Sequence, residues 1–344
     1  MQLCVLYITR YAHTHMRDDL YIRRCLELAE LGQYYVAPNP MVGAVLVSPD
    51  ERVLAEGWHQ QYGQAHAEVN CFLDAERRGV TEAQVHEATL YVSLEPCSHY
   101  GKTPPCAELI LRKRPKRVVV GMLDPNPLVS GRGVQMLREA GIDVVTGVLE
   151  SECRQLNKRF LCLMEKHRPY VILKWAQTKD GFIDRRSSGD DGPLVISSPL
   201  TKQLVHKMRA ENMAILVGAR TVEKDHPRLK TTRWAGRDPI RVALDRHPEG
   251  KDYTDWIVYS DNTDWEFVLA DLAKRGIHSV LVEGGATVLD YILSTGIYDE
   301  VHVEVSETEV FQGVAAPKWN IRTDLAKNLC IEKYEENTMY IFSA

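Results

Sequence analysis

Short apolar runs alternate with segments of helical periodicity along this chain, and that alternation constrains the fold more than any other feature. In the first half, strand-like runs lie at 42–47, 53–58, 89–94, 117–122 and 144–148, with helical segments at 18–31, 66–78, 106–112 and 134–140. In the second half, strand-like runs lie at 169–175, 214–218, 240–245, 256–259, 279–282, 300–305 and 339–342, with helical segments at 200–211, 264–275 and 286–294. Such alternation predicts layered α/β folds.

The length of 344 residues fits two ordinary domains. A charged stretch from Glu152 to His167 separates the two α/β runs, and we expect it to be the linker. The sequence therefore predicts one domain over residues 1–160 and a second over residues 168–344. Residues 1–15 differ in pattern from the periodic segment that follows, and Met16 stands directly before that segment, so we expect residues 1–15 to be dispensable.

The charge balance gives no chain-wide reason to expect an anionic partner. The 42 Lys and Arg residues are interleaved with 47 Asp and Glu residues, for a formal net charge of −5. The basic run 112–117 contains a proline, and its cations suit the end of a helix, so we expect no nucleic-acid binding. No apolar run approaches the roughly 20 residues that a membrane-spanning helix needs.

The eight cysteines are scattered, and we expect no secretory leader, which favours reduced thiols or metal ligands over disulfides. We expect the protein to be cytoplasmic.

One group of residues predicts a catalytic metal site. His66, Ala67 and Glu68 open a helical segment, Cys97 follows a strand about thirty residues later, and Cys106 lies beyond a further eight intervening residues. One imidazole and two thiolates leave a fourth zinc position for water, as in catalytic sites. Glu68 is placed to reach that water without binding the metal, as a general acid and base. Zinc nucleobase deaminases carry the similar pattern H-x-E followed by P-C-x-x-C, with a shorter spacing between the cysteines.

The stretch 94–106, together with 39–43 and 124–127, closely resembles the deaminase half of the bifunctional deaminase/reductases of riboflavin biosynthesis. The resemblance implies a cytidine-deaminase-like three-layer α/β/α domain with Zn²⁺. It also implies that the substrate is 2,5-diamino-6-ribosylamino-4(3H)-pyrimidinone 5′-phosphate, which loses its 2-amino group. We expect the substrate to be bound by Asn39, His99, Lys102 and Thr103, since lysine and hydroxyl groups suit a phosphate.

The second half lacks the G-x-G-x-x-G pattern of a Rossmann fold, but Gly284 and Gly285 follow the strand 279–282 and precede a helix. Motifs between residues 169 and 299 resemble the reductase half of the same family. The resemblance implies a dihydrofolate-reductase-like α/β domain in which NADPH reduces the ribosyl group to ribityl. The implied NADPH contacts are Lys174, Thr221, Asp225, Gly284, Gly285, Ala286 and Thr287. The implied substrate contacts are Leu229 and Glu283, and we add Arg209 and Arg233 because a guanidinium group matches a phosphate.

The chain departs from the family pattern at Thr178 and Lys179, at Met213, over 187–194 and after Val305. These departures concern the NADPH contacts and leave the deaminase assignment intact. One alternative function is a zinc nucleoside or tRNA deaminase with an accessory nucleotide-binding domain. Another is a nucleotide-binding regulator whose zinc site is structural. We favour the bifunctional enzyme acting on a small pyrimidine ribosyl phosphate, and we expect it to be a homo-oligomer.

Overall fold

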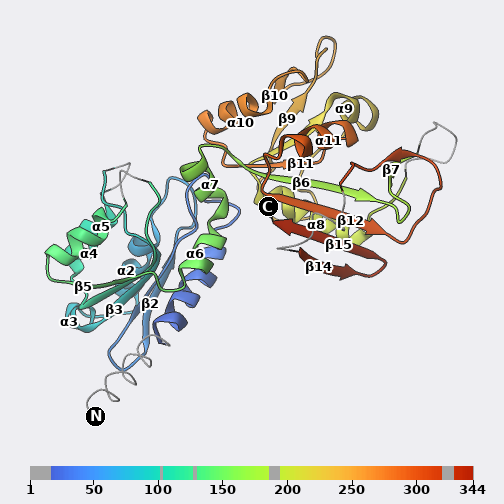
Figure 1. The fold of residues 1–344 in the computed structure, drawn as a ribbon. Coiled ribbons are helices and arrows are strands. Elements are labelled where there is room, and N and C mark those ends of the chain that lie inside the picture. The colour runs from blue at the N-terminus through green and yellow to red at the C-terminus, as the bar shows by residue number, and fades with distance from the viewer. Residues whose placement is uncertain (1–16, 101–103, 127–129, 186–193, 320–328, 344) are drawn as a thin grey trace, which may run out of the picture. The chain divides into compact units, whose positions relative to one another are not determined.

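The computed structural model describes residues 17–100, 104–126, 130–185, 194–319 and 329–343. The chain forms two compact units, Met1–Lys166 and His167–Ala344, and each has its own sheet (Figure 1).

The first unit is built on a five-stranded sheet of order β2-β1-β3-β4-β5. Its strands are β1 (Gly43–Val47), β2 (Val53–Trp58), β3 (Thr89–Leu94), β4 (Arg117–Met122) and β5 (Asp143–Thr146). β1 pairs antiparallel with β2 and β3, whereas β3, β4 and β5 are mutually parallel. The parallel strands β3 and β4 are buried along most of their length, as expected of strands covered on both faces, whereas the edge strand β5 is partly exposed.

Helices cover both faces of this sheet. One core lies between the sheet and α2 (Ala67–Arg77), α4 (Cys106–Lys113) and α5 (Arg132–Glu139), and includes Phe72, Ile110 and Leu137. The other lies under the helix at residues 17–30 and α6 (Glu150–Leu156), and includes Ile22 and Cys153. The predicted three-layer α/β/α arrangement is therefore present. A short helix that the sequence analysis missed, α3 (Glu82–Glu87), begins at a capping box.

The stretch expected to be a linker is helical, so this interpretation was wrong. Residues 150–166 form α6 and α7 (Lys158–Lys166), and Cys153, Leu161 and Cys162 are buried. Asn157, between the two helices, makes two hydrogen bonds to the backbone of Met41. The charges that suggested a linker are half-buried at Glu152, Arg154, Lys158 and Arg159 and exposed at Glu165 and Lys166. The units divide after Lys166.

The second unit is built on an eight-stranded sheet of order β10-β9-β8-β11-β6-β12-β15-β14. The strands are β6 (Tyr170–Gln177), β8 (Ala214–Gly218), β9 (Ile240–Leu244), β10 (Trp256–Tyr259), β11 (Ser279–Val282), β12 (Glu300–Ser306), β14 (Leu329–Tyr334) and β15 (Asn337–Ser343). The strands from β10 to β12 are parallel, and β15 and β14 add an antiparallel edge. A separate small sheet pairs β7 (Phe182–Asp184) with β13 (Val314–Ala315).

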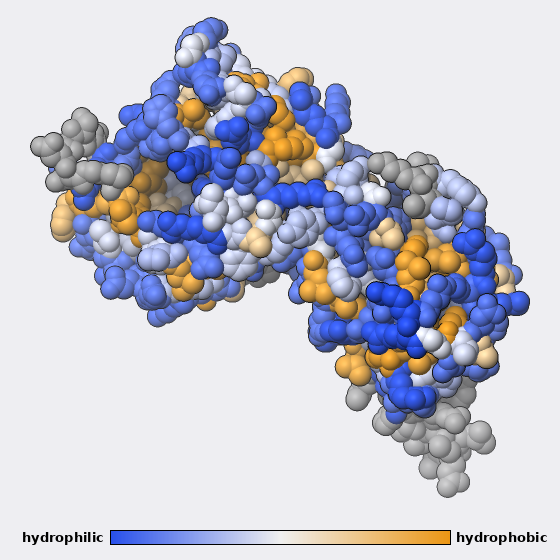
Figure 2. Space-filling view, turned by 180° about the vertical axis from the view of Figure 1, so that it is seen from behind, coloured by the Kyte–Doolittle hydropathy of each residue, from blue (hydrophilic) through white to orange (hydrophobic). Residues whose placement is uncertain are grey.

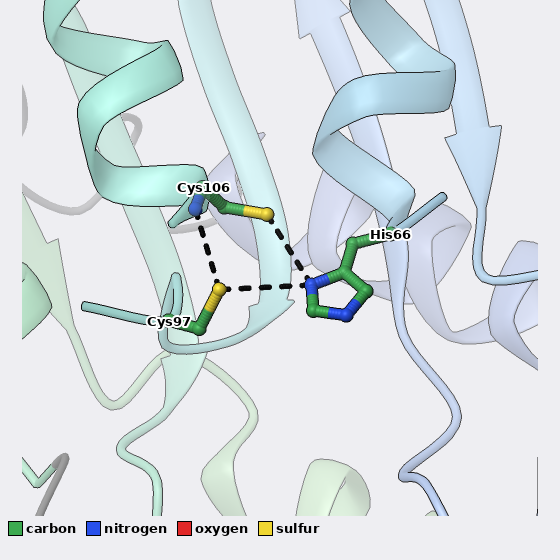
Figure 3. A group of neighbouring side chains, drawn as sticks. All are labelled: His66, Cys97 and Cys106. Carbon is green, nitrogen blue, oxygen red and sulfur yellow. Dashed lines mark hydrogen bonds between the residues drawn. The ribbon is translucent and has the colours of Figure 1, made fainter. Parts of the chain in front are cut away.

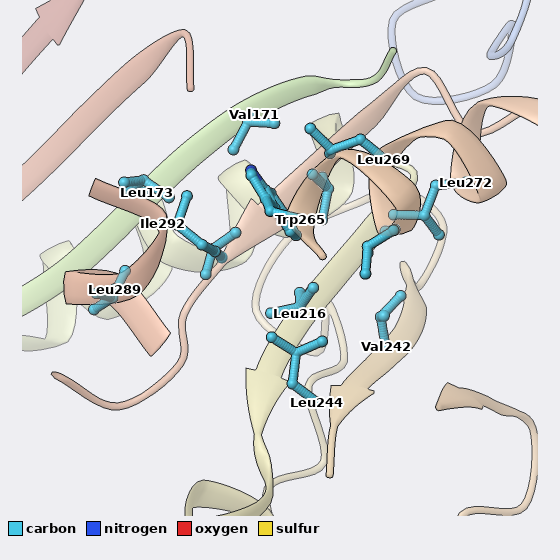
Figure 4. Packing of buried hydrophobic residues seen from close by; sticks show 14 of the residues in the cluster. Val171, Leu173, Leu216, Val242, Leu244, Trp265, Leu269, Leu272, Leu289 and Ile292 are labelled. Atoms are coloured by element: carbon cyan, nitrogen blue, oxygen red, sulfur yellow. The ribbon is translucent and has the colours of Figure 1, made fainter. Parts of the chain in front are cut away.

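The main core of this unit packs α10 (Trp265–Lys274) and α11 (Ala286–Thr295) against one face of the sheet, around Trp265 (Figure 4). Val171, Leu173 and Trp175 of β6 belong to this core. Because side chains alternate along a strand, Lys174 points to the opposite face. The remaining helices are α8 (Pro199–Glu211) and α9 (Ala219–Asp225).

Hydrophilic residues cover most of the surface shown in Figure 2, and hydrophobic residues appear there in separate patches. Within the described ranges, none of the helices has the length and apolar character needed to cross a bilayer.

Candidate active sites

His66 lies at the N-terminal end of α2, which packs closely against β2. Gly57 of β2 makes that packing possible, because a Cβ at this position would lie 2.2 Å from the backbone nitrogen of Cys71 and 2.6 Å from the carbonyl oxygen of Ala67. The strand therefore fixes the height of α2 above the sheet. His66 does not cap the helix with its side chain, which leaves the imidazole available to bind a ligand.

His66, Cys97 and Cys106 converge as the sequence predicts (Figure 3). His66 Nδ1 lies 3.6 Å from Cys97 Sγ and 3.4 Å from Cys106 Sγ, and all three donor atoms lie within 4.8 Å of one another. Neighbouring nitrogen and sulfur ligands of a tetrahedral zinc ion are about 3.5 Å apart. The residues thus fit Zn²⁺ in both donor chemistry and spacing, with one position left for a non-protein ligand.

The surroundings of Cys97 favour its thiolate form. Cys97 Sγ accepts a hydrogen bond of 3.3 Å from the backbone N–H of Cys106, the first residue of α4. Hydrogen bonding from Cys106 and from His66 lowers the pKa of Cys97, against the opposing effect of burial. A thiolate is the form that binds metal.

Glu68 is buried in the first turn of α2, with 3% of its surface exposed. Burial raises the pKa of Glu68 to about 7, and the negative charge of Cys97 adds to this rise. A carboxyl group that titrates near neutral pH can both accept and donate a proton, which suits a general acid and base. It lies two residues from His66 on the same helix, as the sequence analysis assumed.

Glu95 supports the metal-binding loop, and the sequence analysis missed it. This buried carboxylate accepts hydrogen bonds from the backbone N–H groups of Asp124, Gly131 and Val134, at 3.1, 2.9 and 3.2 Å. It thereby ties the segment before Cys97 to the start of α5. The sequence shows only that Glu95 directly follows the strand β3 and precedes Pro96, and this position does not indicate which groups it binds.

Asn39 contacts a second missed residue, His59. Asn39 Nδ2 lies 3.2 Å from His59 Nε2, and His59 Nδ1 lies 3.0 Å from the carbonyl oxygen of Ala65. The two histidine rings, His59 and His66, meet edge to face at 5.4 Å between centroids. Asn39 is thus connected through His59 to the metal ligand His66. The sequence does not reveal this connection, because Asn39 and His59 are 20 residues apart.

Of the other predicted substrate contacts of the first unit, His99 lies within the described residues. His99 is exposed in the loop between Cys97 and Cys106. Lys102 and Thr103 lie outside the described residues.

In the second unit, a cavity of about 270 Å³ brings together four residues that the sequence analysis selected, Lys174, Arg209, Arg233 and Glu283. Ser197, Lys202, Val205 and His206 complete its lining. Four cationic side chains around one small cavity suit a phosphorylated ligand.

Arg209 and Glu283 form a two-point ion pair inside this cavity. Arg209 Nε donates to Glu283 Oε1 at 3.1 Å, and a terminal nitrogen of Arg209 donates to Oε2 at 2.6 Å. Both side chains are mostly buried. The pair fixes the orientation of the guanidinium group that we expect to contact the phosphate.

The residues predicted to bind NADPH gather at the carboxyl ends of β8 and β11. A Cβ at Gly284 would lie 3.2 Å from the backbone nitrogen of Gly218, and one at Gly285 would lie 3.6 Å from Thr221 Oγ1. Ala286 and Thr287 begin α11, and Asp225 ends α9. The absence of a side chain at Gly284 therefore lets the turn after β11 pack against the end of β8, and the start of α11 presents backbone N–H groups of the kind that bind a dinucleotide phosphate.

Two predicted residues of this unit differ in setting from the rest. Leu229 is buried and has a left-handed backbone conformation, with a φ of 53°. It belongs to the turn after α9 and is not among the residues that line the cavity. Lys174, predicted as an NADPH contact, lines the cavity together with the predicted substrate contacts.

Comparison with protein families divides the chain in the same way. Residues 16–122 match the cytidine and deoxycytidylate deaminase zinc-binding region, and residues 169–306 match the RibD C-terminal domain. The first unit therefore has the cytidine-deaminase fold, and the second has the dihydrofolate-reductase-like fold of the RibD reductase domain.

Individual relatives match over most of their length. The riboflavin biosynthesis protein RibD of Bacillus amyloliquefaciens is 40% identical over 319 residues, which is 83% of each chain. RibD of Escherichia coli is 34% identical over 333 residues, 85% of this chain and 88% of the relative.

A solved deaminase/reductase of Thermotoga maritima is 35% identical and superposes with a TM-score of 0.84 over 96% of this chain and 99% of its own. Both family matches, the metal-ligand cluster and this full-length similarity lead to one conclusion: the chain belongs to the RibD family and is a bifunctional deaminase and reductase of riboflavin biosynthesis.

Proposed function

We propose that the first unit binds Zn²⁺ through His66, Cys97 and Cys106 and deaminates 2,5-diamino-6-ribosylamino-4(3H)-pyrimidinone 5′-phosphate. The observation that carries this proposal is that the three ligand atoms lie within 4.8 Å of one another. The buried carboxyl group of Glu68 follows one of the ligands, His66, by two residues. When bound, the ion lowers the pKa of water and so supplies a nucleophile at neutral pH.

Glu68 then moves the proton. Its carboxylate accepts a proton from the attacking water. Its carboxyl form then donates that proton to the 2-amino group, which leaves as ammonia. Asn39, held by His59, supplies an amide for hydrogen bonds to the edge of the pyrimidine. His99, Lys102 and Thr103 are proposed to hold the ribosyl phosphate.

Metal analysis coupled to an ammonia-release assay tests this proposal. We expect about one zinc ion per chain, and ammonia release from the diamino pyrimidine phosphate that stops when the ion is removed by a chelator and returns with added Zn²⁺. Ammonia release from cytidine or from tRNA, with none from the pyrimidine phosphate, would favour the nucleoside or tRNA deaminase. Zinc without ammonia release from any of these would favour a structural site.

We further propose that the second unit uses NADPH to reduce the ribosyl group of 5-amino-6-(5-phosphoribosylamino)uracil to ribityl. When bound, NADPH supplies the hydride, which C1′ of the ring-opened sugar accepts. The proposed substrate contacts are Arg209, Leu229, Arg233 and Glu283. The proposed NADPH contacts are Lys174, Thr221, Asp225, Gly284, Gly285, Ala286 and Thr287.

Arg209→Ala tests the reductase half. The change removes charge-assisted contacts worth roughly 1.5–3 kcal/mol, so the KM for the uracil substrate should rise about tenfold or more. Deamination should stay within about twofold of wild type. Lys207→Ala, on the same helix but outside the cavity lining, serves as the matched control. Unchanged reductase kinetics in Arg209→Ala would remove Arg209 from the substrate site.

Assembly as a homo-oligomer and a cytoplasmic location stay predictions.

A further inference from the structure

Two buried charges lie on neighbouring central strands of the second unit. Lys174 is the one charged residue of β6, whose other residues are apolar apart from Tyr170 and Gln177. Glu304 lies on β12, which pairs parallel with β6. Lys174 Nζ is 3.3 Å from Glu304 Oε2, and the exposed fractions of their side chains are 8% and 0%. Because a buried ion needs a partner, each residue accounts for the presence of the other.

Two side chains besides Lys174 donate hydrogen bonds to Glu304. Ser197 Oγ, just before α8, donates to Oε2 at 2.8 Å, and Asn337 Nδ2 of β15 donates to Oε1 at 2.6 Å. Asn337 also donates to the carbonyl oxygen of Ile196 at 3.1 Å, which fixes its own amide. Burial would raise the pKa of Glu304, but the Lys174 charge and hydrogen bonds from Thr201, Ser197 and Asn337 outweigh it and lower the pKa. Glu304 is therefore a fixed carboxylate.

The reductase cavity borders two partners of this carboxylate. Lys174 and Ser197 line the cavity, whereas Glu304 does not. An ammonium group has three donors, and Lys174 gives one of them to Glu304. The other charged or titratable side chains that face Lys174 around the cavity are Lys202, His206 and Arg209 of α8, Arg233 and Glu283.

We propose, on the basis of the reductase function proposed above, that Glu304 is a positioning residue of the reductase site. It holds the ammonium group of Lys174 at the wall of the cavity for contact with the bound ligand. Without this carboxylate, Lys174 would face Lys202, Arg209 and Arg233. Among the described residues that line the cavity, Glu283 is the one anion, and it is already paired with Arg209. Like-charge repulsion would then move the ammonium group or lead it to compete for Glu283. Glu304 thus acts on the ligand through Lys174, without touching it.

Glu304→Gln tests the proposal, because it removes the charge and keeps the volume. The KM for the uracil substrate or for NADPH should rise roughly tenfold or more, with kcat changed by less than about threefold. Glu300→Gln is the matched control: Glu300 is buried on the same strand, but its partners Tyr170 and His302 do not line the cavity. Deamination by the first unit reports the amount of enzyme in every sample, and thermal unfolding of the second unit reports whether that unit is folded.

Glu304→Gln in a Lys174→Met background distinguishes two roles of Glu304, which are to position Lys174 and to stabilise β12. If Glu304 acts through Lys174, Glu304→Gln should cost less than about twofold in kcat/KM once Lys174 is absent. A full loss in that background, or unchanged KM values in the single variant, would overturn the proposal. If Glu304→Gln does not fold, Asn337→Ala loosens the same carboxylate and should raise the same KM by roughly threefold. That rise should also vanish in the Lys174→Met background, and its persistence there would overturn the proposal.

Discussion

At the scale of single residues, the deaminase site depends on side chains at the ends of secondary-structure elements. His66 precedes α2 and Cys106 begins α4, while Cys97 lies in the loop after β3. These positions place donor atoms at the edge of the core, so a substitution there changes the chemistry of the site while leaving the packed interior intact. Glu68 differs, because its buried position is itself the source of its raised pKa.

Cys106→Ser should lose most of the bound zinc, because two remaining ligands hold the ion weakly and a serine hydroxyl is a poor replacement for a thiolate. The measurement is zinc content per chain after gel filtration. Cys71→Ser is the matched control, since Cys71 is a buried cysteine of the same unit outside the ligand cluster. Zinc retained at the wild-type level in Cys106→Ser would refute the ligand assignment.

Glu68→Gln should lower the rate of deamination by on the order of 100- to 10,000-fold, because the amide cannot transfer the proton. Zinc content should stay the same, as Glu68 lies outside the ligand cluster. Ammonia release measures the effect, and Glu76→Gln, an exposed change on the same helix, is the control. Deamination at a near-normal rate would exclude Glu68 as the general acid and base.

At the scale of elements, the contact between β2 and α2 sets the position of the zinc site. Gly57 lets the backbone of α2 approach the strand, and Asn70 of the helix donates a hydrogen bond of 2.7 Å to the carbonyl oxygen of Trp58. The N-terminal end of the helix, with His66 and Glu68, is thereby held relative to the sheet. A change in this packing should move the ligand and the carboxyl group together.

Gly57→Val should displace α2, because its Cβ would overlap backbone atoms of Cys71 and Ala67, which cannot rotate away. Overpacking of this kind costs roughly 1–3 kcal/mol of unfolding free energy. We expect a lower melting temperature of the first unit and a loss of zinc affinity, with reductase activity retained. Val53→Ala, at the exposed start of the same strand, is the control. Wild-type zinc affinity in Gly57→Val would show that this contact does not position the site.

At the scale of the whole molecule, the two units have separate sheets and separate cores. Each candidate site is built from residues of one unit alone, so each should work when the other is inactivated. The deaminated product of the first site is the proposed substrate of the second site. The two sites therefore catalyse consecutive reactions.

A mixture of full-length Glu68→Gln and full-length Arg209→Ala should therefore oxidise NADPH when given the diamino substrate, after a lag in which the intermediate accumulates. Glu68→Gln alone should leave NADPH unchanged with the diamino substrate, yet oxidise it at close to the normal rate when given the deaminated intermediate. Absorbance of NADPH follows both reactions. If Glu68→Gln also fails with the intermediate, the two sites depend on each other.

The sequence by itself determined the elements and the zinc ligands, because both are encoded locally. Period-2 and period-3.6 patterns located most strands and helices, and His66, Glu68, Cys97 and Cys106 stand at element ends that those patterns mark. The stretch from Glu152 to His167 was interpreted as a linker because of its charged residues, whereas buried side chains such as Cys153 and Leu161 pack α6 and α7 into the first unit.

Only the tertiary structure decided which distant polar groups meet. Glu304 and Lys174 are 130 residues apart, Asn39 and His59 are 20 apart, and Glu95 binds backbone groups up to 39 residues away. No local pattern records such pairs, since they depend on the order of strands in a sheet and on the face to which each side chain points. Burial then makes the pairing energetically necessary, because a charge withdrawn from water must find its partner within the fold.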